Sequence, residues 1–409
     1  MSKPMGAIPG GFRAEDGMLL IGGRRADSLV DEAGDTPLFV YDVGKIAAQV
    51  ELFRRHFSGI NLHYAIKANT YAPLLKHIAK LVDGLDVASA GEMEAALASG
   101  TGAAEISFAG PGKRDDELAA AIASGVTVNL ESEGEAERAL AIGRGQGRTP
   151  RLAVRVNPDF EIKGSGMRMG GGAKPFGVDA ARVPALIRRL IEGGAEWRGL
   201  HIFAGSQALS PEALIEAQRA TVALAAELAE AAGATPPLVN LGGGFGIPYF
   251  ATESSLDVAQ VGAALAESLR GRPASLATSG FAIELGRWLV GEAGVYLTRI
   301  VDRKESHGKT FLVTDGGMHH QLAASGNFGQ VVRRNYPVAI ASRFGAEAEE
   351  EASIVGCLCT PLDRLADDVM VPRAEAGDLV AVFLAGAYGL SASPAAFLGH
   401  PPAREMLVE

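Results

Sequence analysis

Cysteine is scarce in this chain: among 409 residues only Cys357 and Cys359 occur. Two cysteines one residue apart cannot build a disulfide framework, and a Cys-x-Cys pair without clustered partners makes a poor zinc site. His319 and His320 have no such partner nearby in the sequence, so we expect them to cap a turn. The sequence therefore predicts no metal centre, and the scarcity of cysteine favours the reducing cytoplasm.

Long apolar runs and an excess of basic charge are also missing. No stretch reaches the roughly 18 consecutive apolar residues of a membrane span, and the first residues lack the apolar segment of a signal peptide. The 38 Lys and Arg residues are outnumbered by 48 Asp and Glu residues, which gives a net charge of −10. We therefore expect no membrane insertion and no nucleic-acid partner.

Short apolar runs alternate regularly with Ala- and Leu-rich helical stretches between residues 60 and 290. Eight runs have the length of strands: Leu62–Ile66, Leu85–Ala88, Ile106–Ala109, Thr127–Leu130, Leu152–Val156, Leu200–Phe203, Leu238–Leu241 and Phe281–Glu284. Eight strand–helix pairs over this length predict an α/β fold of the (β/α)8 TIM barrel type. A doubly wound sheet is the alternative, but no G-x-G-x-x-G turn follows the first strand.

After residue 290 the pattern changes to β-branched runs without long helices, which predicts a β-rich C-terminal domain. Two further strand-like runs lie within residues 17–41. We therefore expect residues 1–42 to contribute strands to the β domain, residues 43–290 to form the barrel, and residues 291–409 to form the rest of the β domain.

The active site of a TIM barrel lies at the C-terminal ends of its strands. Lys67 follows the first predicted strand directly, where burial would lower the pKa of its amine and make it a nucleophile toward a carbonyl group. A solvated loop lysine is the equally simple alternative. Asp86, Arg155, His201 and Glu284 stand at the ends of four other predicted strands.

An anion site is predicted after strands seven and eight. Gly242, Gly243 and Gly244 leave their backbone N–H groups unshielded, and Arg287 follows the eighth strand. A nucleophilic lysine, an anion site, a histidine that stacks on a ring and a carboxylate for a ring nitrogen are together what pyridoxal 5′-phosphate requires. The sequence therefore predicts this cofactor.

Several motifs resemble those of the fold-type III pyridoxal-phosphate decarboxylases, the diaminopimelate and ornithine decarboxylase family. They are Tyr64–Asn69 (YAIKAN), Asp86–Glu92 (DVASAGE), His201 with Gly205-Ser206-Gln207, Gly242–Gly244, Glu284–Arg287 (ELGR), Cys359 and Gly386–Gly389 (GAYG). The resemblance covers the chain from about residue 35 to the end. It implies an alanine racemase-like barrel with a β domain, and a homodimer with shared active sites.

The resemblance also implies a role for each site residue. Lys67 would form the Schiff base, His201 would stack on the cofactor ring and Glu284 would bind its nitrogen. The remaining cofactor-binding residues would be Asp86, Arg155, Ser206, Gly242, Gly243, Gly244, Gly286, Arg287 and Tyr388. Cys359 would protonate the substrate carbon in the neighbouring subunit's site, with Cys357 as the alternative acid.

Departures from the family pattern bear on the substrate, for which Thr360, Asp363 and Tyr388 are the candidate contacts. Thr360 follows Cys359 where the family has an acidic residue that binds a distal ammonium group. Phe328–Val332 replaces an Arg-Pro-x-Leu-Tyr stretch that binds a distal carboxylate in diaminopimelate decarboxylases. Ordinary diaminopimelate is therefore not the expected substrate.

Three stretches resemble a particular offshoot, the exosortase-system-associated decarboxylases of bacterial exopolysaccharide clusters. They are Lys163–Gly177, His319–Gly329 and Cys357–Leu362. This offshoot is similar to decarboxylases that act on an aminoacyl group carried by an acyl carrier protein. The resemblance thus implies decarboxylation of an L- or D-amino acid or of a carrier-bound aminoacyl group. A free diamino-acid decarboxylase such as diaminopimelate decarboxylase, an amino-acid racemase of the same fold, and a non-catalytic regulatory homologue are the alternatives.

Overall fold

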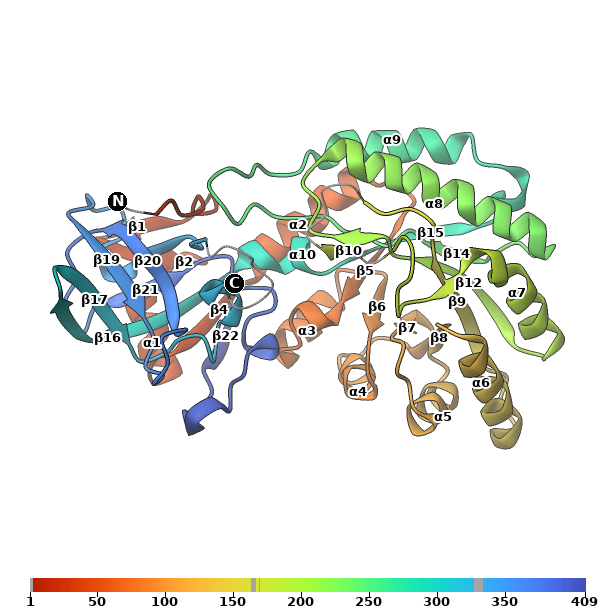
Figure 1. Cartoon of the computed structure of the whole chain (residues 1–409), viewed down its shortest axis with the longest axis horizontal. Helices are drawn as coiled ribbons and strands as arrows, with labels where there is room; N and C mark the ends of the chain where they lie inside the picture. Colours follow the sequence, from red (N-terminus) through yellow and green to blue (C-terminus); the bar gives the residue numbers. More distant parts are fainter. Residues whose placement is uncertain (1–2, 163–166, 169, 327–333) are drawn as a thin grey trace. The chain divides into compact units, whose positions relative to one another are not determined.

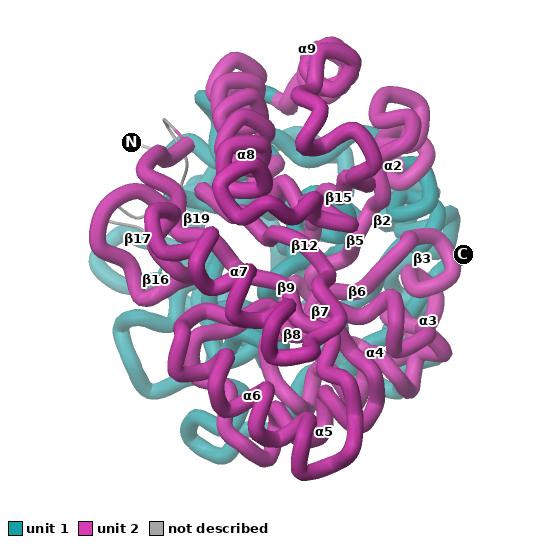
Figure 2. The backbone as a smooth tube through the Cα atoms, turned by 90° about the vertical axis from the view of Figure 1, so that its right-hand side faces the viewer, with its two compact units in different colours: residues 1–48, 247–254, 287–409 teal, residues 49–246, 255–286 magenta. Residues whose placement is uncertain are grey.

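The computed structural model describes residues 3–162, 167–168, 170–326 and 334–409. Phe328–Val332 and part of the Lys163–Gly177 stretch therefore lie outside the described residues. The chain divides into two compact units: one holds residues 1–48, 247–254 and 287–409, and the other residues 49–246 and 255–286 (Figure 2). We call them the β unit and the barrel unit. The boundaries at residues 42 and 290 stay predictions beside this division.

Eight parallel strands close into a barrel in the barrel unit, which confirms the predicted fold (Figure 1). In order around the barrel they are β5 (Asn61–Ala65), β6 (Gly84–Val87), β7 (Ile106–Phe108), β8 (Thr127–Leu130), β9 (Arg151–Asn157), β12 (Glu196–Ile202), β14 (Leu238–Asn240) and β15 (Gly280–Leu285). The pairing of β8 with β9 and of β15 with β5 closes the ring. Each predicted run overlaps one of these strands, and β11 (Val178–Asp179) adds a short ninth strand beside β9.

Helices follow the strands and cover the barrel's outside (Figure 1). They are α2 (Val43–His56), which begins in the β unit, α3 (Ala72–Ile78), α4 (Ala90–Ala98), α5 (Asp115–Ser124), α6 (Glu133–Gln146), α7 (Val183–Glu192), α8 (Pro211–Ala232) and α9 (Val258–Arg270). Serine hydroxyls accept hydrogen bonds from backbone N–H groups at the starts of α4, α6 and α8. Such caps satisfy donors that have no partner inside the helix, and so they fix where each helix begins.

The β unit contains an eight-stranded sheet built from both ends of the chain. Its strands are β4 (Leu38–Asp42), β16 (Gly294–Ser306), β17 (Lys309–Thr314), β18 (Val338–Ile340), β19 (Glu350–Val355), β20 (Arg364–Val371), β21 (Leu379–Val382) and β22 (Arg404–Val408). Strand β4 pairs with β16 on one side and with β22 on the other. The sequence did not predict β20.

The remaining strands and helices are short. Strands β1 (Arg13–Glu15), β2 (Met18–Ile21) and β3 (Arg24–Arg25) form a separate small sheet, and helix α1 (Ala26–Ala33) follows them where only strands were expected. Strands β10 (Met167–Arg168) and β13 (Gly205–Ser206) pair with each other, and α10 (Arg287–Val290) is a single turn. No helix among the described residues is long and apolar enough to span a membrane.

Candidate active site

A pocket of about 200 Å³ opens at the C-terminal ends of the barrel strands. It is lined by Ala65, Lys67, Asp86, Val87, Ala88, Ala109, Gly110, Pro111, Arg155, Phe176, His201, Phe203 and Glu284. Five residues predicted from the strand ends therefore line one cavity: Lys67, Asp86, Arg155, His201 and Glu284. This is the end of the barrel where enzymes of this fold carry their chemistry.

His201 and Glu284 form a buried pair inside this pocket. The Nε2 atom of His201 lies 3.0 Å from Oε2 of Glu284, and both side chains are buried. Burial alone would raise the pKa of Glu284, but the hydrogen bond and charge of His201, with the charges of Lys67 and Arg155, lower it from 4.5 to about 2. Glu284 is therefore a carboxylate at neutral pH. The Nδ1 atom of His201 is buried and has no hydrogen-bond partner among the described residues.

Lys67 stands on a single turn of 3₁₀ helix, Ile66–Ala68, directly after β5. Its Nζ lies 5.8 Å from the centroid of the Phe203 ring, a distance at which the ring face attracts an ammonium group. The side chain is exposed, which corrects the expectation of a desolvated lysine. Lys67 is exposed because it lies on the 3₁₀ turn, past the end of the buried strand and at the edge of the pocket.

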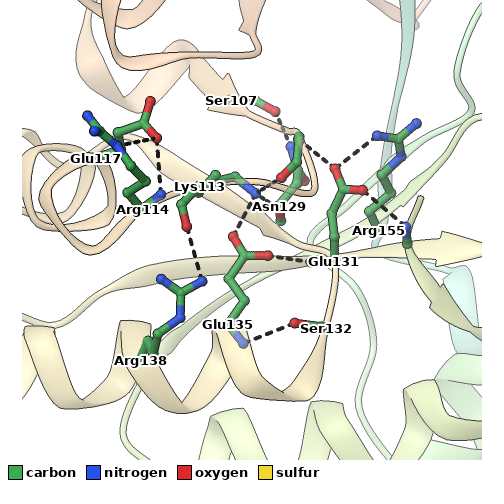
Figure 3. Close-up of polar contacts among 12 residues, drawn as sticks. Ser107, Lys113, Arg114, Glu117, Asn129, Glu131, Ser132, Glu135, Arg138 and Arg155 are labelled. Atoms are coloured by element: carbon green, nitrogen blue, oxygen red, sulfur yellow. Dashed lines mark hydrogen bonds and ion pairs between the residues drawn. The ribbon is translucent and has the colours of Figure 1, made fainter. Parts of the chain in front are cut away.

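A network of buried charges supports the wall of the pocket at Arg155 (Figure 3). Arg155 donates to Glu131 at 2.9 Å, and Glu131 also accepts hydrogen bonds from the backbone N–H groups of Gly110 and Gly177. The charges of Arg155 and Lys113 outweigh burial and lower the pKa of Glu131. Glu131 thus ties three segments around the pocket to one ionised carboxylate.

Lys113 extends this network to the loop that carries Gly110. Its ammonium group donates to the carbonyl oxygens of Gly110 and Asn129 and to the Glu135 carboxylate, at 2.7 to 2.9 Å. A buried ammonium group with three acceptors has all its protons paired, which is the condition for tolerating burial. The loop lining the pocket is therefore held in one conformation.

Glu131 was not predicted from the sequence, although it supports the pocket wall through Arg155. It follows the fourth strand directly, as Lys67 follows the first predicted strand. No predicted site residue lies at the end of the third or the fourth strand. The same rule, applied to all eight strands, would have found it.

Asp86 has a partner inside the barrel. Its carboxylate lies 3.3 Å from Nδ1 of His63 on β5, and both groups are buried. Burial opposes a charge on His63, but the charge and hydrogen bond of Asp86 outweigh it and raise the pKa of the imidazole. Asp86 therefore contributes to the interior of the barrel as well as to the pocket.

The triple-glycine loop packs against the barrel strand β15 and the short strand β13 with no room for side chains. A Cβ on Gly243 would lie 1.8 Å from the carbonyl oxygen of Glu284, and one on Gly244 would lie 2.6 Å from that of Gly205. Gly242 and Gly244 also have φ angles of +68° and +82°, which favour glycine. Glycine thus brings this backbone close to Glu284. The pairing of β13 places the Ser206 backbone beside Met167.

Arg287 and Tyr388 lie together in the β unit. The Arg287 guanidinium carbon is 4.7 Å from the centroid of the Tyr388 ring, and its Nη1 donates to the Tyr249 hydroxyl at 2.7 Å. Tyr388 has a φ of +54°, a strained conformation for a tyrosine that is typical of functional sites. Gly286 directly precedes Arg287 but belongs to the barrel unit.

The candidates of the Cys359 loop also belong to the β unit. Cys359 is exposed, and Thr360 is half-buried. Asp363 is buried, and its two oxygens accept the backbone N–H groups of Met318 and Leu358 at 2.6 and 2.8 Å. These contacts give Asp363 a structural part, because it joins two loops.

The polar groups that line the barrel pocket suit the ring of a pyridoxal cofactor. A buried carboxylate with a pKa of about 2 can pair with a protonated ring nitrogen, and the imidazole beside it has an unpartnered buried Nδ1. Lys67 supplies an amine at the rim, and the crowded glycine loop supplies backbone close to Glu284. Lys67, His201 and Glu284 are thus the residues that would hold the cofactor.

Comparison with known proteins agrees with this geometry. Residues 43–291 match the model of the pyridoxal-dependent decarboxylase pyridoxal-binding domain. The chain is 37% identical over 382 residues, 91% of its length and 89% of the relative's, to the L-glutamyl-[BtrI acyl-carrier protein] decarboxylase of Niallia circulans. It is 33% identical to the diaminopimelate decarboxylase of Methanothermobacter thermautotrophicus, covering 96% of this chain and 91% of that one.

The solved structures agree on the fold. A diaminopimelate decarboxylase from M. jannaschii, in complex with L-lysine, superposes with a TM-score of 0.88. The match covers 98% of this chain and 93% of that one, at 26% identity.

Proposed function

The chain belongs to the family of pyridoxal-dependent decarboxylases, and from this premise we propose that it decarboxylates an aminoacyl group carried as a thioester on an acyl carrier protein. The family uses pyridoxal phosphate, so this enzyme is a pyridoxal-phosphate-dependent carboxy-lyase. The observation that carries the site assignment is the convergence of Lys67, His201 and Glu284 on one pocket.

Each of these residues has a distinct proposed part. Bound pyridoxal phosphate supplies an electron sink for the negative charge left at the substrate α-carbon. Lys67 would bind the cofactor aldehyde through its amine, Glu284 would hold the ring nitrogen in its protonated form, and His201 would contact the ring. We assign the phosphate to the backbone of Gly242–Gly244 with Ser206. The cofactor-binding roles that the resemblance implies for Gly286, Arg287 and Tyr388 remain predictions.

The overall reaction requires one proton. The bond from the α-carbon to the carboxylate breaks and releases carbon dioxide, and a new carbon–hydrogen bond forms at the α-carbon. We propose that the Cys359 thiol delivers this proton. Its exposure in the single chain leaves it available to the active site of a second subunit.

The proposal of a carrier-bound substrate rests on two observations. The 37% identical relative is named for an L-glutamyl group on an acyl carrier protein. In addition, the residue after Cys359 is the half-buried Thr360, which has no charge with which to bind a distal ammonium group. A thioester removes the charge of the distal carboxyl, so neutral contacts suit it. Diaminopimelate decarboxylation is the second candidate, because relatives at 33% identity carry that name.

The location and pathway follow from the sequence resemblance alone. We propose a cytoplasmic homodimer that serves exopolysaccharide biosynthesis. Exposed apolar side chains of the β unit support a protein interface: Leu362, three residues after Cys359, is 55% exposed, and Leu398 is 54% exposed.

A substrate comparison tests the proposal. The purified holoenzyme is incubated with L-glutamyl-loaded carrier protein, and in parallel with free glutamate, diaminopimelate, lysine and ornithine, while carbon dioxide release is measured. We expect turnover of the loaded carrier and little of the free amino acids. Faster turnover of free diaminopimelate than of the loaded carrier would replace this proposal with the second candidate.

A further inference from the structure

A cluster of potential metal ligands lies in the β unit, outside the barrel pocket. His319 follows β17, Cys357 follows β19 and His400 precedes β22. One ligand atom from each residue lies within 4.8 Å of the ligand atoms of the other two. The three residues are 38 and 43 positions apart in the sequence, so only the folded sheet brings them together.

His319 is the buried member of this cluster, and its environment is unusual for a histidine. It is 0% exposed, and neither ring nitrogen has a hydrogen-bond partner among the described residues. Leaving buried polar atoms without hydrogen-bond partners destabilises the folded state. A bound ion is one of the few ways in which a native protein recovers such a cost.

The neighbouring His320 shows the contrast. Its Nδ1 lies 3.1 Å from the Tyr296 hydroxyl, and its Nε2 lies 3.0 Å from the carbonyl oxygen of Pro401. Both ring nitrogens of His320 therefore have partners in the fold, and these are distant residues rather than the turn that the sequence predicted both histidines to cap. His319 packs against it at a ring distance of 3.7 Å and faces His400 at 5.3 Å.

Cys357 and His400 are the other two members of the cluster, and both are half-buried. The Cys357 Sγ lies 3.8 Å from Nδ1 of His400 and 3.4 Å from the carbonyl oxygen of Asp315. The sulfur of Cys357 and a nitrogen of each histidine form the donor combination that zinc prefers. Ligand atoms around tetrahedral zinc are separated by about 3.3–3.8 Å, so the present spacing needs an adjustment of about 1 Å.

Asp363 makes the backbone under the cluster rigid. It accepts hydrogen bonds from the N–H groups of Met318 and Leu358, which adjoin His319 and Cys357. Gly317 and Gly356 leave space for this carboxylate, since a Cβ on either would lie 2.2 Å from its oxygens. Two of the three ligands are therefore positioned by one buried group, as second-shell residues position the ligands of metal sites.

We propose that His319, Cys357 and His400 bind a zinc-type divalent metal ion, with the fourth position open to water. Binding converts the Cys357 thiol to a thiolate, and the released proton goes to solvent. Burial, with the neighbouring imidazoles of His320 and His400, lowers the pKa of His319 to about 4, so its ring is already neutral near neutral pH. The three proposed ligands belong to the β unit, whereas the residues that line the pyridoxal pocket belong to the barrel unit.

Cobalt binding tests the proposal, because the visible absorbance of bound Co²⁺ shows whether sulfur is a ligand and whether the coordination is tetrahedral. Mass spectrometry counts the zinc in the untreated holoenzyme. The holoenzyme is then stripped of metal with a chelator and titrated with Co²⁺, and its absorbance is measured in the red part of the visible spectrum. We expect one ion per chain and tetrahedral bands. Cys357→Ser and His400→Gln should each lower metal occupancy at least tenfold, while the matched control Cys359→Ser keeps the ion.

Two results would overturn the proposal. One is octahedral cobalt or no stoichiometric ion in the wild-type protein. The other is equal metal binding by the wild-type protein and the Cys357→Ser variant. Circular dichroism and the cofactor absorbance of each variant distinguish loss of the ion from loss of the fold. Cys357 and His400 are suitable positions for substitution because both are only half-buried.

Discussion

Lys67 is the residue proposed to hold the cofactor covalently in the barrel pocket. Replacing it with Ala removes the one amine among the described residues that line this pocket. We expect the visible absorbance of the bound cofactor to disappear while the protein stays folded, as judged by circular dichroism. A fully retained band would assign the cofactor to another lysine.

Glu284 shows how a barrel can keep a carboxylate ionised in a buried place. Its pKa is lowered from 4.5 to about 2, so its ionised form is more favourable in the folded than in the unfolded chain. The stabilisation is complete above pH 4.5 and is lost as the pH falls toward 2. This gives a stability test that does not depend on activity.

The Glu284→Gln variant should therefore differ from wild type in a pH-dependent way. We expect it to be less stable near pH 7, and the difference to shrink as the pH falls below 4.5. Urea denaturation midpoints at pH 7, 5 and 3 measure this. A difference that stays constant over this range would show that Glu284 does not titrate as its surroundings indicate.

The two cysteines can be separated by their effects on turnover. Cys359→Ala should keep the cofactor and slow turnover by about 10²–10⁴-fold, the range for a lost general acid. Cys357 is the weaker candidate, because burial and the nearby Asp363 raise the pKa of its thiol to about 11. If Cys359→Ala kept the wild-type rate and Cys357→Ala lost it, Cys357 would be the acid.

At the scale of elements, the glycine loop after β14 controls the position of the end of β15. A Cβ at Gly243 would contact the Glu284 carbonyl oxygen at 1.8 Å, so Gly243→Ala must displace one of the two segments. We expect a loss of about 1–3 kcal/mol in stability and weaker cofactor retention.

Gly145→Ala is the matched control for this substitution. Gly145 lies in α6 with nothing within 4 Å of an added Cβ, so alanine there should leave stability equal or higher by up to about 1 kcal/mol. Thermal unfolding and cofactor titration measure both variants. Equal stability and equal cofactor binding of the two variants would mean that the loop shifts without moving Glu284.

The elements that the sequence predicted best are those with local signals. Each barrel strand is a short apolar run, and its pattern does not depend on distant residues. Helix α1 and strand β20 were missed because both mix charged with apolar residues, as in the Arg364–Val371 sequence RLADDVMV. Their structure is set by packing in the β unit rather than by local pattern.

The site could be predicted in part for the same reason. Lys67, His201 and Glu284 follow a positional rule of the barrel, so the sequence was sufficient to predict that they lie at the same end of it, where they line one pocket. The contacts of Asp363 and the meeting of His319 with Cys357 and His400 depend on how loops of the sheet come together. No local spacing contains that information, and the sequence accordingly predicted no metal centre.

At the scale of the whole molecule, the proposed homodimer makes a complementation prediction. Lys67→Ala and Cys359→Ala chains are each inactive, but mixing them with subunit exchange creates dimers with one intact site. About a quarter of the wild-type activity should return, because half of the random dimers are mixed and each has one working site of two.

The control mixes Lys67→Ala with the double variant Lys67→Ala, Cys359→Ala, which cannot form an intact site. Light scattering establishes the dimer in each sample. No recovery in mixed dimers would mean that Lys67 and Cys359 act within the same subunit.

The pairing of β4 with both β16 and β22 has a consequence for biosynthesis. The Tyr41 hydroxyl donates to Glu405, a partner 364 residues later in the chain. At about 5–20 residues per second a ribosome needs roughly 20–70 s to cover that distance. Throughout this interval β4 has been made but lacks β22, and all strands of the barrel are complete once residue 285 has been made. The barrel can therefore fold during translation, whereas β4 pairs with β22 only after residues 404–408 have left the ribosome.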